Sequence, residues 1–239
     1  MRTGKGLLNG PIAFGFALLV CAIASASAQD SKNPYPAMAP LAQYLMASPA
    51  DEIALARTAA PPSISGDAEV LTLGSHGYET AVKGKNGFVC LVGRGWAASF
   101  DDPVFWNPKN RSPICVNPAA VRSILLPYFE RTQWVLAGVS KSDMADRIKA
   151  QLKAKTLVLP EPGAMSYMMS KQGYLSDDGG HWHPHVMFWV ANTDGAAWGA
   201  DVKGSPVLST QVSPEPITIF FIPVKKWSDG TLDEMEKHQ

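Results

Sequence analysis

The chain has 239 residues, with 21 basic and 21 acidic side chains and a formal net charge of zero. This balance gives no electrostatic footprint for nucleic acid or for an anionic membrane surface, so the composition argues against both classes of partner. The length suffices for one sizeable domain with its own hydrophobic core.

The N-terminus has the pattern of a bacterial signal peptide, predicted over residues 1–28. Arg2 and Lys5 form a basic start, and residues 12–23 are uncharged and mostly apolar but too short to span a bilayer. Ala26-Ser27-Ala28 is the small-residue pattern that precedes cleavage, so the mature chain should begin at Gln29. We therefore expect a periplasmic or secreted protein.

Two alternatives to cleavage after Ala28 remain. Cys21 suggests a lipoprotein anchor, but Val20 occupies a position where that processing needs a very small residue. An uncleaved N-terminal anchor would need a longer apolar run. The mature chain, residues 29–239, carries 19 basic and 21 acidic side chains, a net charge of −2, and has no further apolar stretch of membrane length. No integral membrane segment is expected after signal removal.

Cys90 and Cys115 are the two cysteines of the mature chain. In an oxidising compartment a single pair indicates one disulfide bond, which would stabilise the fold by roughly 3 kcal/mol. A metal or redox pair is the alternative, and no C-x-x-C spacing supports it.

The sequence predicts where three helices begin, and it predicts strands in two groups. Ser48-Pro49, Asn117-Pro118 and Ser140 open helices, with the two serines as capping side chains; the first helix should run to about Ala59 and the second be kinked or divided at Pro127. A short helix is also expected within residues 40–46, and an ordered loop over 96–113. Strands are expected at residues 68–73, 78–82, 88–92, 164–169, 185–190, 207–211 and 217–224.

The order of these elements favours an α+β fold, with a mainly antiparallel sheet and helices packed against it, in one domain. Asn86-Gly87 lies between two of the expected strands and is a strong hairpin signal, so residues 68–92 are interpreted as an antiparallel meander. Residues 217–222 are apolar on both faces, which is typical of a central strand. Residues 29–37 should be a loose lead-in and residues 225–239 a polar tail.

His181-Trp182-His183-Pro184-His185 holds three of the five histidines and is the sharpest candidate site. An extended conformation would put all three imidazoles on one face. A rise of about 3.3 Å per residue separates the outer two by about 13 Å, so only neighbours two apart could chelate one ion. Pro184 suits an edge, a bulge or a strand start.

The missing metal ligands would come from elsewhere. Asp177 and Asp178 lie just upstream, and His76 occupies a glycine-flanked turn. Oxygen and imidazole ligands together would suit zinc, whereas the nearby Met165, Met168, Met169 and Met187 would suit copper. Surface histidines, core methionines and an Asp-Asp-Gly-Gly turn are the alternatives without a metal.

Signatures of other chemistry are incomplete. Gly93-Arg94-Gly95 formally starts a dinucleotide-binding motif, but Trp96 and the residues after it do not fit a phosphate-binding helix. No G-x-S-x-G elbow occurs, and Ser166 or Ser170 could act as a nucleophile only beside a histidine in space. The residues alone do not decide whether the chain is an enzyme.

Three stretches together resemble a group of exported bacterial proteins of no known activity: residues 86–92, residues 163–170 and the histidine run 181–185. The resemblance covers most of the mature chain and implies no functional residue.

The sequence thus predicts an exported, soluble α+β domain with a site built around His181, His183 and His185. The most specific hypothesis for this site is the binding of a transition metal, zinc or copper. Metal-assisted hydrolysis is the enzymatic version of that hypothesis. The alternatives are a non-catalytic periplasmic protein that binds a small ligand, with Trp182, Trp189 or Trp198 lining the pocket, and a structural or interaction protein.

Overall fold

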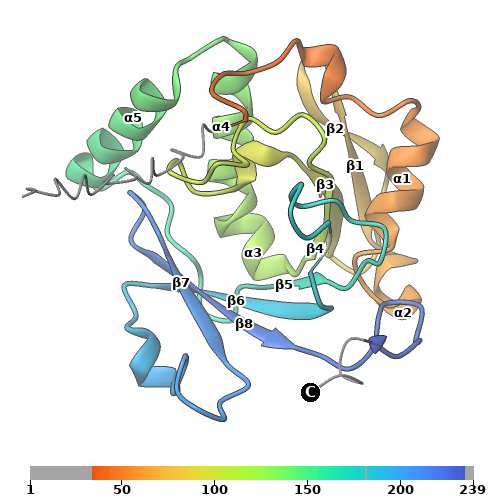
Figure 1. Ribbon diagram of the computed structural model, residues 1–239. Helices are drawn as coiled ribbons and strands as arrows, with labels where there is room; N and C mark the ends of the chain where they lie inside the picture. The colour runs from red at the N-terminus through yellow and green to blue at the C-terminus, as the bar shows by residue number, and fades with distance from the viewer. Residues whose placement is uncertain (1–33, 181, 235–239) are drawn as a thin grey trace, which may run out of the picture. The chain divides into compact units, whose positions relative to one another are not determined.

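The computed structural model describes residues 34–180 and 182–234 (Figure 1). The predicted signal peptide, its cleavage site at Ala28 and Gln29, and His181 lie outside the described residues. The helices are α1 (Pro49–Arg57), α2 (Pro62–Ser65), α3 (Pro118–Ser123), α4 (Leu125–Leu136) and α5 (Lys141–Ala154), with 3₁₀ turns η1 (Leu41–Gln43), η2 (Gly95–Ala97) and η3 (Gly195–Trp198). The strands are β1 (Glu69–Gly74), β2 (Gly77–Val82), β3 (Val89–Gly93), β4 (Ser112–Val116), β5 (Met165–Met168), β6 (His185–Ala191), β7 (Leu208–Val212) and β8 (Ile217–Pro223).

The eight strands form one sheet in the order β2-β1-β3-β4-β5-β6-β8-β7. Every neighbouring pair is antiparallel except β1 and β3, which are parallel. Together with the five helices this confirms the predicted α+β fold. None of the helices in the described residues has the length and apolar character needed to cross a membrane.

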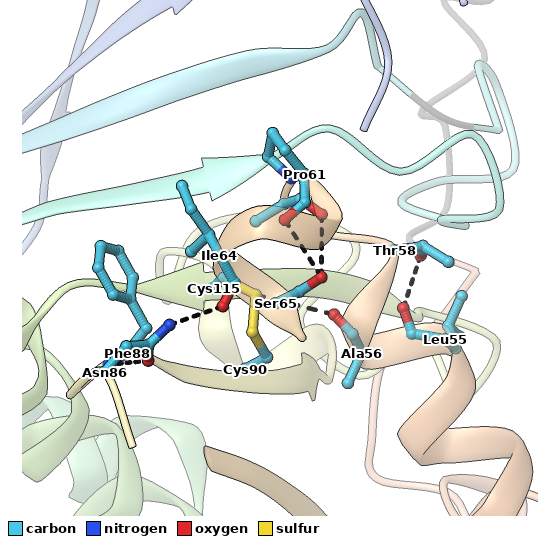
Figure 2. The surroundings of a disulfide bond; sticks show 11 residues. Leu55, Ala56, Thr58, Pro61, Ile64, Ser65, Asn86, Phe88, Cys90 and Cys115 are labelled. Carbon is cyan, nitrogen blue, oxygen red and sulfur yellow. Dashed lines mark hydrogen bonds between the residues drawn. A yellow bond between two sulfur atoms is a disulfide. The ribbon is translucent and has the colours of Figure 1, made fainter. Parts of the chain in front are cut away.

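The predicted antiparallel meander over residues 68–92 is wrong in its second half. β1 and β2 form a hairpin, but β3 pairs with β1 on its other edge instead of with β2. The connecting segment crosses the start of β1, where Lys85 N–H donates to Asp67 O and Glu69 N–H donates to Phe88 O. Asn86 therefore stabilises the crossing segment and not a hairpin turn. Its side chain accepts a hydrogen bond from the Phe88 N–H and donates one to Ile64 O (Figure 2).

The predicted helix starts are confirmed because capping is a local interaction. The side-chain oxygens of Ser48, Asn117 and Ser140 each accept a hydrogen bond from the backbone N–H three residues later. The second helix is divided as expected, but the break falls at Ile124. Pro127 is the third residue of α4, where the backbone N–H has no partner within the helix.

Two other expectations are corrected. α1 ends at Arg57 instead of Ala59, and Pro62 opens the short helix α2. Residues 112–116 form β4, a strand that was not predicted and whose first two residues were expected at the end of the loop 96–113; it pairs with both β3 and β5. The predicted strand over 217–224 is confirmed as β8, which lies between β6 and the edge strand β7.

Two apolar layers enclose the β1–β3–β4 part of the sheet. Ala56 and Ala59, from α1 and the turn after it, pack on Val70, Cys90 and Cys115 on one face. The opposite face carries Leu71, Leu91 and Val116, which pack against Ala120 of α3 and Leu125 of α4. Alternate residues of β1, β3 and β4 thus enter different cores, as the pleat of a strand requires.

The predicted disulfide is present between Cys90 and Cys115. The two residues are direct cross-strand partners on β3 and β4, and both are fully buried beneath α1 and α2 (Figure 2). The bond therefore links two strands that are 25 residues apart in the chain at the centre of the first apolar layer.

A buried ion pair lies beside this core. Arg94 and Glu52, of α1, are almost completely buried and lie 2.8 Å apart. The Arg94 guanidinium also donates to Tyr44 O and Val92 O, and Glu52 accepts from the Leu73 N–H. These bonds compensate much of the cost of burying the two charges.

Candidate functional site

The histidine run leads into β6, which begins at His185 and follows the buried Pro184. Proline at this place removes no ladder hydrogen bond, as expected from the sequence. The described residues of the run differ in exposure, because Trp182 and His183 are exposed while His185 is 5% exposed. The run therefore presents one histidine toward solvent and places the next against the sheet.

His183 pairs with an aspartate that the sequence did not single out. Its Nδ1 atom lies within hydrogen-bond distance of Asp233 Oδ2, and the Asp233 side chain is almost buried while the His183 side chain is 47% exposed. Asp233 belongs to residues 225–234, part of the expected polar tail, which form a closed loop. In that loop Asp233 N–H donates to Lys225 O and Trp227 is buried. The carboxylate is thus fixed beneath the imidazole.

His185 is held by its neighbour's backbone and by aromatic rings. Its Nδ1 atom lies 2.7 Å from His183 O, and its ring centroid lies 6.1 Å from that of Trp182 and 5.7 Å from that of Phe221. Burial lowers the pKa of His185, the nearby His183 lowers it further, and the hydrogen bond to His183 O acts in the opposite direction. The structure therefore favours the neutral imidazole at this position.

These contacts fix the same tautomer on both rings. An ionised carboxylate and a backbone carbonyl can only accept hydrogen bonds, so Nδ1 must carry the proton in His183 and in His185. In a neutral ring the lone pair then lies on Nε2. Each histidine thus has one nitrogen occupied by an oxygen acceptor and one nitrogen equipped to bind a metal ion or accept a proton.

The space beside His185 is small. A pocket of about 10 Å³ is lined by Met168, Ser170, Leu175, Trp182 and His185, enough for about one water molecule. A drug-sized ligand needs at least an order of magnitude more. The pocket next to this histidine therefore suits a water or an ion and not an organic ligand.

The three tryptophans considered for a ligand pocket do not meet at the site. Trp182 lies against His185, and the Trp189 indole N–H donates to Ser166 Oγ. Trp198 stacks on Phe220, whose side chain points to the opposite face of the sheet from that of Phe221. Only Trp182 accompanies the histidines.

The acidic residues upstream are engaged elsewhere. Asp177 accepts hydrogen bonds from the hydroxyls of Tyr35 and Tyr174 and forms an ion pair with Lys109 at 2.9 Å. These donors, the Tyr174 hydroxyl first, hold the pKa of Asp177 well below its usual value. Asp178 is exposed in the same loop. Asp177 therefore belongs to a hydrogen-bond network at the surface, and the carboxylate that contacts His183 is that of Asp233.

His76 lies far from the run. It is exposed in the β1–β2 turn, and β2 is five strand positions away from β6 in the sheet. At about 4.8 Å per strand this corresponds to roughly 24 Å. No partnership between His76 and His183 is supported by this arrangement.

The methionines and serines of β5, of β6 and of the residues just after β5 have separate roles. Met168 is the cross-strand partner of His185 and lines the same small pocket, whereas Met187 packs against Ile217 and Ile219. Ser166 accepts from Trp189, and Ser170 shares a hydrogen bond with Thr58 at 2.6 Å. Neither serine hydrogen-bonds a described histidine, so the pairing that a serine nucleophile needs is not formed.

Within residues 34–180 and 182–234, no group of three or more His, Cys, Asp or Glu side chains is arranged to hold a metal ion. His181 falls in the gap between these ranges. Comparison with known proteins adds no assignment, because no family model, no curated protein and no solved structure matches the chain.

Proposed function

We propose that the protein binds a transition-metal ion, zinc in the first place, through the Nε2 atoms of its histidine run. The observation that carries the proposal is the His183–Asp233 pair, in which a nearly buried carboxylate occupies Nδ1 of a half-exposed imidazole. Metal-binding histidines almost always donate their second ring N–H to a carboxylate or a backbone carbonyl.

His185 has the other form of the same arrangement, since its Nδ1 faces His183 O at 2.7 Å. Its lowered pKa supports the neutral ring that a metal ion requires. His181 is the further ligand suggested by the sequence. Copper is the second metal to consider, because the thioether-bearing Met168 lines the pocket beside His185.

A metal ion held by two or three protein ligands keeps a position for water. Such an ion lowers the pKa of the bound water toward neutrality, and hydrolysis is the reaction class that this chemistry serves. In that reaction Asp233 would act as a positioning residue, because it contacts His183 and not the reacting atoms.

A structural role is the competing proposal. The His183–Asp233 contact joins the start of β6 to the loop 225–234, and Val224 N–H donates to Pro184 O beside it. If this is its only role, the contact contributes to stability and no metal follows the histidines.

Metal analysis of the purified mature protein separates the two. We expect about one equivalent of zinc or copper in the wild type, its loss in His183→Ala, and an affinity about 10- to 100-fold weaker in Asp233→Asn. His76→Ala is the matched control, since His76 is exposed and distant, and it should keep the metal.

The metal analysis and the melting temperatures distinguish metal binding from a purely structural role. Absence of metal from the wild type after reconstitution with zinc or copper, or a full equivalent retained by His183→Ala, would contradict metal binding. A melting temperature lowered in both His183→Ala and Asp233→Asn, with no metal in any variant, would establish the structural role instead.

We further propose export from a bacterial cytoplasm. The signal-peptide pattern before Gln29 and the buried Cys90–Cys115 bond both support an oxidising destination. N-terminal sequencing of the protein recovered from periplasm or medium should begin at Gln29. An intact N-terminus on protein recovered only from the cytoplasm would contradict it.

A further inference from the structure

A larger pocket lies away from the histidines, at the end of α1. It has a volume of about 300 Å³ and lies between Arg57, the helix α2 and the loop that carries Ser228 and Asp229. This loop lies beside α2 in Figure 1, and Ser228 N–H donates to Met169 O at 3.0 Å, which fixes its backbone. The pocket is in the size range of small-ligand sites.

Arg57 contributes an uncompensated positive charge to this pocket. It is the last residue of α1 and partly buried, and its guanidinium forms no hydrogen bond or ion pair with any described residue. Its Nε atom is buried without a partner. A buried donor left unsatisfied is costly, so the position favours an acceptor that enters the pocket.

The hydroxyl groups around the pocket differ in what they offer. The Thr58 hydroxyl donates to Leu55 O and the Ser65 hydroxyl donates to Ala60 O (Figure 2). Both hydroxyl protons therefore already have a backbone carbonyl as acceptor. The Ser228 hydroxyl has no partner among the described residues and lines the pocket as a second donor. Arg57 and Ser228 are thus the groups equipped to bind an anion.

Asp229 does not oppose an anion as strongly as its charge suggests. Its carboxylate lies 3.2 Å from Lys171 Nζ and accepts hydrogen bonds from the side chain and backbone of Thr231. These interactions, the Thr231 side chain first, lower the pKa of Asp229 to about 2, and Lys171 offsets its charge. The Arg57 guanidinium has no such partner.

We propose that this pocket binds a small organic carboxylate with a compact apolar body. The Arg57 guanidinium and the Ser228 hydroxyl would bind the carboxylate, and the apolar part would lie against Ala60 and Pro62. Arginine matches the planar geometry of a carboxylate and forms charge-assisted hydrogen bonds with it. The proposal goes beyond metal binding, because none of these residues belongs to the histidine site.

Hexanoate and its neutral amide, hexanamide, are a matched pair of probes for the full mature protein. Titration followed by amide NMR should show hexanoate binding about tenfold more tightly than hexanamide, with shifts at Arg57, Ser65 and Ser228. Arg57→Gln should remove this preference, and Ser228→Ala should reduce it by a few-fold.

Arg147→Gln is the control, because Arg147 of α5 lies over the ring of Trp134 of α4 and does not line the pocket. It should preserve the preference. Arg57→Lys retains the charge without the planar fork and should give an intermediate preference, which provides a second test if Arg57→Gln does not fold. Equal affinity for the acid and the amide, no binding of hexanoate, or a preference that survives Arg57→Gln would overturn the proposal.

Discussion

Two parts of the sheet are covered differently: the part formed by β1, β3 and β4, here called the first end, and the part formed by β6, β8 and the edge strand β7, here called the second end. β3 has helices on both faces and all five of its residues are buried, whereas three of the five residues of edge strand β7 are exposed. Near β7 the sheet is covered by the 3₁₀ turn η3, whose Trp198 stacks on Phe220 while remaining 42% exposed. The disulfide and the Glu52–Arg94 pair belong to the first end, and the histidine run opens β6 toward the second.

This contrast separates stability from access. Side chains enclosed by two layers contribute to the core but cannot meet a ligand, whereas short loops leave groups such as His183 half exposed. The proposed metal ligand His183 lies on such a loop beside a rigid sheet, where binding residues are found in many proteins. We therefore expect substitutions at the first end to change the free energy of unfolding, and those at the histidines to change binding.

The largest effect is expected at the buried ion pair. Arg94→Met should destabilise the protein by about 3 to 5 kcal/mol, because it leaves the Glu52 carboxylate buried without its counter-charge. The double variant Glu52→Leu with Arg94→Met should recover much of the loss. Urea unfolding measures both. A single variant as stable as the wild type would show that the first end is not the more tightly packed one.

Removal of the disulfide should have the next largest effect. Replacing Cys90 and Cys115 together by alanine should lower the free energy of unfolding by about 3 kcal/mol, for a loop closed across 25 positions. Chemical denaturation of the variant beside the oxidised wild type checks this. Unchanged stability would contradict a stabilising role for the bond.

At the second end the effects should be smaller. Trp198→Ala removes the ring stacked on Phe220 at 4.2 Å and should cost about 2 kcal/mol, since the indole is only partly buried. Leu126→Ala, at an exposed position on α4, is the control and should change stability by less than about 0.5 kcal/mol. A Trp198→Ala effect as large as that of Arg94→Met would remove the contrast between the two ends.

Alkaline pH gives the mildest test of the first end. Burial raises the pKa of Tyr78, whose hydroxyl donates to Val92 O. The unfolded chain loses this proton near pH 10 while the folded chain keeps it, so stability should fall as the pH rises above 10. Tyr78→Phe should reduce that slope by up to about 1.4 kcal/mol per pH unit. Parallel curves for the two proteins would contradict a Tyr78 hydroxyl that stays protonated in the folded chain.

Local signals in the sequence predicted local structure well. Ser48, Asn117 and Ser140 cap helices through bonds to residues three positions away, and residues 29–239 contain only one pair of cysteines. The parallel pairing of β1 with β3 was missed because Asn86-Gly87 has the composition of a hairpin turn but lies in the segment that crosses the start of β1. That choice depends on strand order, which no short window of sequence contains.

The candidate site was predictable only in part. The histidine run indicated where to look, but Asp233 lies 50 residues from His183 in a segment that is mostly polar. Asp177 lies closer to His183 in the sequence and was the candidate ligand. In the structure its carboxylate instead accepts from the hydroxyls of Tyr35 and Tyr174 and pairs with Lys109. No residue pattern near Asp233 distinguishes it from other aspartates, because its importance comes from the loop closure that brings it beneath the imidazole.

The state of the ring nitrogens tests the central claim most directly. In protein labelled with ¹⁵N-histidine, long-range ¹H–¹⁵N spectra at slightly alkaline pH should show Nδ1 protonated and Nε2 bare in both His183 and His185. Addition of zinc should shift the Nε2 resonance of His183, and Asp233→Asn should weaken that response. A proton on Nε2 of His183, or an Nε2 resonance that zinc leaves unchanged, would contradict the account.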